Sequence, residues 1–134
     1  MAGKTEAEAL VRRFYEPLTT GDADVVDQVL AAEWTAEPPL HAGPGPDGWK
    51  GTAGYLRSVL ADLTFTIEDI VVDGDRVAVR HVTSGKQVAE LLGIPATGRQ
   101  VAIRASDYHQ IEGGRIVQSW HLEDYYGVLQ QLGQ

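Results

Sequence analysis

The chain has 134 residues, 43% of them hydrophobic and 22% charged, a composition typical of a globular protein with one core and room for a ligand cavity. Its formal net charge of -8 argues against nucleic acid and anionic membranes as partners and favours an uncharged ligand over a phosphate, although acidity also serves solubility. Because the chain has no cysteine, it has no disulfide, no thiolate nucleophile and no zinc-thiolate site.

No segment has the apolar length of a signal peptide or a membrane-spanning helix. We therefore expect a cytoplasmic protein that forms one domain over residues 1–134.

The N-terminal part of the chain has helical periodicity. Apolar residues recur every three or four positions from Thr5 to Thr19, and Thr5 with Glu8 matches a capping box. A shorter second helix is expected up to Leu30 and a third from Thr52 to Leu63.

Between these helices lies a segment rich in proline and glycine, from Glu37 to Gly51. Its composition predicts a long irregular loop over the domain rather than regular structure. Trp49 in this segment either contacts a ligand or anchors the loop.

The second half of the chain predicts four strands: Thr64 to Val72, Arg76 to Gly85, and two more in the stretch from Val101 to Asp124. Helices followed by hairpin-connected strands indicate an α+β fold. A curved, mostly antiparallel sheet would wrap around the N-terminal helices and form a conical barrel with an internal cavity.

The last hairpin carries the candidate chemistry, and its turn at residues 112–114 decides which side chains meet. With a three-residue loop and Gly114 in the left-handed conformation, Ile111 pairs with Arg115 and odd-numbered residues share a face. Ala105 then lies opposite His121, with Asp107 on the diagonal within hydrogen-bonding reach. This register groups Asp107, His109, Ser119 and His121 on one face, and Tyr108, Ile116, Trp120 and Leu122 on the other.

A two-residue Gly-Gly loop would instead place Asp107 on the face of Gln118 and Trp120. We favour the first register because it gathers the ionisable groups. For His109 considered by itself, the alternative to a site role is a solvent-exposed position at the end of its strand. Asp107 and His121 lie inside strands among apolar residues, where an unpaired charge is costly, and this favours a shared pocket.

Several motifs resemble one family over nearly the whole chain. They are GDADVVDQVLAAEW, GPGPDGWKG, the loop Gly-Ile-Pro-Ala-Thr-Gly-Arg from Gly93 to Arg99, and the ending from Asp124 to Gly133. Together they resemble the SnoaL-like polyketide cyclases of the nuclear transport factor 2-like superfamily.

The resemblance implies a homodimer or homotetramer that needs neither metal nor cofactor and closes the last ring of an aromatic polyketide in antibiotic biosynthesis. In the ring-closing members an Asp of the last strand is the base and a His of the preceding strand assists it. On the glycine turn and the Gln-Leu-Gly ending, these positions fall on His121 and Asp107, so the two residue types are exchanged.

Aldol ring closure needs a base for an acidified C–H and donors for the developing oxyanion. Our hypothesis is that His121 removes the proton and Asp107 orients it, with the roles reversible. Candidate contacts to a hydrophobic aromatic substrate are His109, His81, Trp34, Tyr55, Trp49, Tyr15 and Ser119.

Other chemistry remains open, because one fold supports many reactions. The alternatives are a cofactor-independent hydroxylase or monooxygenase acting on an aromatic polyketide, and a small-molecule-binding module without activity. An epoxide hydrolase is disfavoured, because the three-residue separation of Asp107 and Arg104 puts them on different strand faces.

Overall fold

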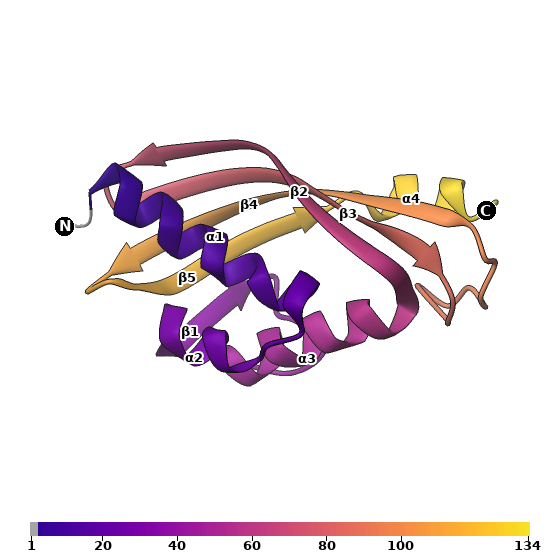
Figure 1. Ribbon diagram of the computed structural model, residues 1–134, viewed down its shortest axis with the longest axis horizontal. Coiled ribbons are helices and arrows are strands. Elements are labelled where there is room, and N and C mark those ends of the chain that lie inside the picture. Colours follow the sequence, from indigo (N-terminus) through magenta and orange to yellow (C-terminus); the bar gives the residue numbers. More distant parts are fainter. Residues whose placement is uncertain (1–2) are drawn as a thin grey trace.

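The computed structural model of the protein describes residues 3–134 and shows helices packed on a curved sheet (Figure 1). In chain order the elements are α1 (Lys4–Thr20), α2 (Asp24–Val29), β1 (Leu30–Glu37), α3 (Gly45–Val59), β2 (Leu60–Asp73), β3 (Arg76–Gln87), β4 (Gln100–Glu112), β5 (Arg115–Glu123) and α4 (Tyr125–Gln131). The α+β prediction is confirmed. No helix within residues 3–134 is long and apolar enough to cross a membrane.

The five strands form one mixed sheet in the order β1-β5-β4-β3-β2. The pairs β2–β3, β3–β4 and β4–β5 are antiparallel, as expected, whereas β1 runs parallel to β5. Within the described chain β1 and β2 are the sheet edges, so the predicted cone is an open curved sheet and not a closed barrel. Helix α3 contacts both edge strands.

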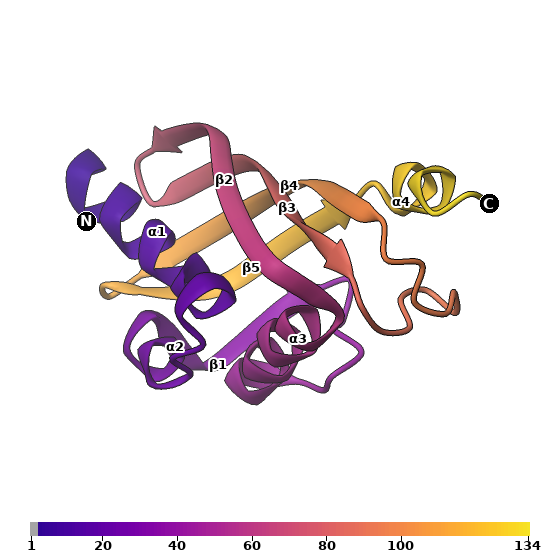
Figure 2. The same cartoon turned by 45° about the vertical axis from the view of Figure 1, so that its right-hand side comes forward.

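The helices cover one face of the sheet. In Figures 1 and 2, α1 lies across this face, α2 and α3 lie on the side of β1, and α4 extends from the opposite end with the C-terminus. The main core joins α1, α2 and β1 to the sheet through apolar side chains that include Val11, Phe14, Leu18, Val26, Leu30, Val77, Ile111 and Ile116. A second cluster holds α4 on β4 through Val101, Ile103, Val128 and Leu132.

Helix α1 matches its prediction within one residue at each end, but its predicted capping box is wrong. The N-cap is Gly3, and no side chain caps the helix. The helix ends at Gly21, whose φ of 74° lies in the left-handed region that glycine tolerates.

The prediction that the whole segment from Glu37 to Gly51 is irregular is wrong in its second half. Helix α3 begins at Gly45, seven residues before the predicted start at Thr52, with a proline in its first turn. Proline is tolerated there because the first N–H groups of a helix have no partner within it. The helix also ends earlier than predicted, and β2 begins at Leu60.

Strand β1 was not predicted, so the expected four strands are five. Its sequence, LAAEWTAE, is rich in alanine and glutamate and has few β-branched residues. It is a strand because it pairs with β5, which lies more than 75 residues later in the chain.

The hairpin of β4 and β5 puts its predicted ionisable residues on one face, but its turn and the face of Ile116 differ from the prediction. Glu112 pairs with Arg115 across a two-residue Gly-Gly turn, and Ile111 pairs with Ile116. A bulge after Ile116 then shifts the register by one residue, so that His109 pairs with Ser119 and Asp107 directly with His121. The predicted three-residue loop and diagonal pairing are therefore wrong, and Ile116 lies in the core.

Candidate functional site

Six polar or aromatic side chains meet between α1 and the inner face of the sheet. They come from α1, β1, β3, β4 and β5 and are Tyr15, Trp34, His81, Asp107, His109 and Ser119. All six were named as candidates from the sequence. We call them the interior polar group.

Asp107 is the charged centre of the interior polar group. The Tyr15 hydroxyl donates to its Oδ2 at 2.6 Å, and Nε2 of His81 lies 2.7 Å from the same oxygen. Burial by itself raises the pKa of this carboxyl, but the hydrogen bonds from its neighbours, that from His81 first, hold the pKa below its ordinary value. Asp107 is therefore an anion at neutral pH, in a side chain only 10% exposed.

His109 lies deeper and is neutral. Its residue is 0% exposed, and burial lowers its pKa to about 4. Its Nε2 lies 2.9 Å from the Tyr15 hydroxyl and its Nδ1 lies 2.7 Å from Ser119 Oγ, which in turn accepts from Trp34 Nε1 at 3.0 Å.

The hydrogen bonds of these residues have one consistent direction. The Tyr15 phenol keeps its proton, because burial and the nearby Asp107 charge raise its pKa, and it gives that proton to Asp107. Tyr15 must then accept from Nε2–H of His109, which leaves Nδ1 of the neutral ring to accept from the Ser119 hydroxyl. Trp34 can only donate, so each N–H and O–H group in the series from Trp34 to Asp107 has one acceptor.

His121 lies opposite Asp107 in the sheet but has other hydrogen-bond partners. Its Nδ1 is 2.7 Å from Glu123 Oε1, and its Nε2 is 2.7 Å from the Pro38 carbonyl oxygen. Both partners only accept, so both ring nitrogens donate and the ring is a cation. Its pKa is raised, first by the hydrogen bond to Glu123. The direct Asp107–His121 hydrogen bond that we expected is absent from the described chain, since Asp107 bonds to Tyr15 and His81 instead.

The other two predicted contacts lie outside this group. Trp49 stacks on Phe14 with ring centroids 4.5 Å apart and donates to the Phe14 carbonyl, so it anchors the start of α3 in the core. Tyr55 is 47% exposed on α3, and its hydroxyl donates to the Glu90 carbonyl.

Two contacts of the site were missed. Glu123 was not among the predicted site residues, although its spacing of two from His121 puts both on one strand face. Phe65 of β2 stacks on Tyr15 with ring centroids 4.6 Å apart and lies 4.9 Å from the His81 ring. Only the tertiary pairing of β2 and β3 brings Phe65 there.

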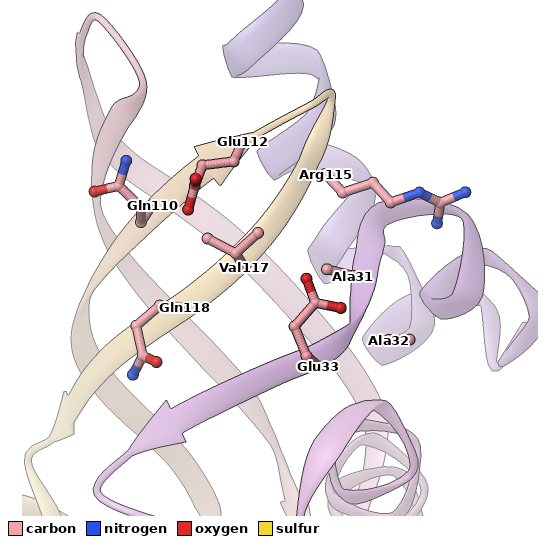
Figure 3. Close-up of a pocket in the computed structure, with 8 residues that line it drawn as sticks. All are labelled: Ala31, Ala32, Glu33, Gln110, Glu112, Arg115, Val117 and Gln118. Carbon is pink, nitrogen blue, oxygen red and sulfur yellow. The ribbon is translucent and has the colours of Figure 1, made fainter.

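A separate hollow of about 580 Å³ lies at the other end of the hairpin (Figure 3). Ala31, Ala32, Glu33, Gln110, Glu112, Arg115, Val117 and Gln118 line it, and none of these belongs to the interior polar group. It is open and lined by side chains of both charges, so we place the candidate chemistry at the buried group and not here. Across residues 3–134, no three His, Asp or Glu side chains are arranged to hold a metal ion.

Comparisons with known proteins identify a family and several relatives of this chain. The sequence profile of the family described as SnoaL-like polyketide cyclase matches residues 9–132. The aklanonic acid methyl ester cyclase DnrD of Streptomyces peucetius is 28% identical over 130 residues, which cover 93% of this chain and 89% of that protein.

Two solved structures are also similar over nearly their whole length. TsrD from Streptomyces laurentii is 32% identical with a TM-score of 0.91, covering 99% of this chain and 98% of that one. IdmH from Streptomyces antibioticus, a proposed polyketide cyclase, is 31% identical with a TM-score of 0.82, covering 96% of this chain and 99% of that one.

Proposed function

The chain belongs to the family of SnoaL-like polyketide cyclases, and on this premise we propose that it closes a ring in an aromatic polyketide by an intramolecular aldol reaction. The substrate class follows from relatives that are named as cyclases of aklanonic acid methyl ester, at 28% identity. A tricyclic aromatic polyketide ester is therefore the first compound to test.

The observation that carries this proposal is the buried Asp107 carboxylate with its hydrogen-bonded neighbours. A buried carboxylate beside histidines can take part in proton transfer. Buried carboxyl groups with a shifted pKa are frequent at catalytic sites. Aldol closure needs only a proton acceptor and donors for the oxyanion, and the proposal therefore involves no metal or organic cofactor.

Within this proposal His121 is not the base of our first hypothesis. His121 has no free lone pair while it donates to both Glu123 and Pro38. It supplies positive charge at the half-buried side of the site. A substrate oxygen could replace the Pro38 carbonyl as the acceptor for Nε2–H, which would stabilise the developing alkoxide.

The experiment compares turnover and binding in the wild type and in Asp107→Asn. The amide keeps the size of the side chain but removes the charge, so we expect turnover to fall by about a hundredfold or more while the ester still binds. Asp73→Asn, the same change at the exposed last residue of β2, is the matched control and should keep wild-type turnover. If Asp107→Asn turns over at the wild-type rate, the proposal is wrong; if it loses binding alone, the chain is a binding module.

We also propose that the chain acts as a homodimer or homotetramer. The outer face of the sheet exposes Trp120 and Leu122, and Tyr108 lies edge-on to Trp120 with ring centroids 5.4 Å apart. Apolar residues gathered on a sheet face favour association. Light scattering of the wild type and of Leu122→Lys tests this, and a monomeric wild type would contradict it.

A further inference from the structure

His81 carries a nitrogen with an unusual environment. Within residues 3–134, its Nδ1 is the buried side-chain nitrogen or oxygen that has no hydrogen-bond partner. The side chain is only 10% exposed, so water does not satisfy this atom from outside. A buried polar atom without a partner costs free energy, and in native proteins it needs a reason.

The protonation of His81 follows from the other side of its ring. Nε2 lies 2.7 Å from Oδ2 of the Asp107 carboxylate, which can only accept, so Nε2 carries a proton. A second proton on Nδ1 would be a buried donor with no acceptor. The less costly state is the neutral ring with a bare lone pair on Nδ1.

No other nitrogen of the site offers a free lone pair. In His109 one ring nitrogen donates to Tyr15 and the other accepts from Ser119, and in His121 both nitrogens donate. The remaining competitor is the Asp107 carboxylate itself. Its lowered pKa makes it a weaker base than an imidazole, whose ordinary pKa lies close to neutral pH.

We propose that Nδ1 of His81 is the atom that takes the proton from the substrate, with Asp107 as the positioning residue that holds the ring through Nε2–H. The inference rests on the ring-closing function proposed above. The C–H bond beside a carbonyl breaks, its proton moves to Nδ1, and its electron pair forms the enolate. The enolate carbon then bonds to a second carbonyl carbon, whose oxygen takes the proton back from Nδ1. The product has the mass of the substrate, and no oxidant or reductant is consumed.

The rings on either side of His81 indicate how a substrate reaches it. The Tyr15 ring lies 5.1 Å away and is held by hydrogen bonds to Asp107 and His109, whereas the Phe65 ring lies 4.9 Å away and has no polar anchor. Phe65 is also half-buried. Of the two rings, Phe65 is therefore the one that an apolar substrate ring can displace beside His81.

The first test is turnover of a tricyclic polyketide ester by His81→Gln. A glutamine amide can still donate to Asp107 but has no basic nitrogen. The variant therefore distinguishes a His81 that acts as the base from a His81 that only positions the Asp107 carboxylate. We expect turnover to fall by about a hundredfold or more. His41→Gln, the same change at an exposed histidine of the loop before α3, should keep wild-type turnover. If His81→Gln stays within about tenfold of the wild type, Asp107 is the base and the His81 proposal is overturned.

The second test needs no variant and no turnover. Nitrogen-15 imidazole spectra of the wild-type protein at neutral pH report which ring nitrogen carries the proton. The proposal predicts a bare Nδ1 and a protonated Nε2 for His81, and a doubly protonated ring for His121. A proton on Nδ1 of His81 overturns the proposal. If the wild type leaves the ester unchanged, the cyclase proposal falls for that substrate, and the spectra still decide whether His81 holds a free proton acceptor.

Discussion

Tyr15 connects the two halves of the interior polar group, and the variant Tyr15→Phe removes only its hydroxyl. That oxygen donates to Asp107 at 2.6 Å and accepts from His109 at 2.9 Å. Losing a hydrogen bond to a charged group costs about 1.5–3 kcal/mol, and an unsatisfied buried donor costs about 1–3 kcal/mol. Because one hydroxyl serves both partners, these costs overlap, and we expect the free energy of unfolding to fall by about 3 kcal/mol.

Urea unfolding followed by circular dichroism measures this change. With a slope of about 2 kcal/mol per molar urea, the midpoint should fall by about 1.5 M. Tyr126→Phe removes a hydroxyl from an exposed ring of α4 and should change stability by less than about 0.5 kcal/mol. A loss below about 1 kcal/mol in Tyr15→Phe, or equal losses in the two variants, would refute the two buried hydrogen bonds that we assign to the Tyr15 hydroxyl.

Three further changes test other parts of the structure. Between pH 6.5 and about 4 the unfolded state binds a proton that folded His109 does not, so stability should fall by about 3 kcal/mol as the pH drops through this window. His121 has a raised pKa; its contribution is fully present below pH 6.5 and is lost only as the pH rises, so it does not cancel this trend. A flat stability profile of the wild type, or an unchanged slope in His109→Gln, would contradict this. In α3, Gly48→Ala would put a Cβ 1.9 Å from the backbone oxygen of Gly43 and should lower stability by at least about 2 kcal/mol in thermal melts. Gly54→Ala lies in open space on the same helix and should raise stability by about 0.5–1 kcal/mol, so equal effects of the two variants would contradict this packing. Gln87→Leu removes the buried amide that holds the loop after β3, so hydrogen exchange of that loop should speed up by at least about tenfold, and unchanged exchange would contradict this role.

The face of the last hairpin could be predicted from the sequence, although its turn could not. Alternation along a strand puts Asp107 with His109 and Ser119 with His121. The two-residue turn and the bulge after Ile116 together put these four residues on one face, as the predicted three-residue loop would have done. A bulge has no reliable signal in a single sequence, because Val117 suits a regular strand equally well.

The partners of Asp107 could not be predicted, because they come from distant parts of the chain. Tyr15 lies on α1, 92 residues away, and His81 lies on β3, 26 residues away. A hairpin brings together only residues that are close in sequence, and for this reason His121 was predicted as the partner of Asp107. His81 was predicted only as a substrate contact, and the register of β3 on β4 decides that its ring reaches Asp107.

The elements that were missed have weak local signals and are stabilised by contacts with the rest of the fold. The alanines and glutamates of β1 favour a helix, yet Leu30 and Trp34 are buried against the core, and the strand pairs with β5. The first turn of α3 is rich in glycine and proline, which usually indicates a loop. There the burial of Trp49 outweighs local propensity.

The mass of the product formed from a tricyclic aromatic polyketide ester is the most direct test of the proposed ring closure. The wild-type protein, without added metal, flavin or nicotinamide, should give a product of unchanged mass and altered absorbance. The His81→Gln variant should form it at least about a hundredfold more slowly. A product heavier by one oxygen atom would instead identify a hydroxylase and contradict the proposed acid–base ring closure.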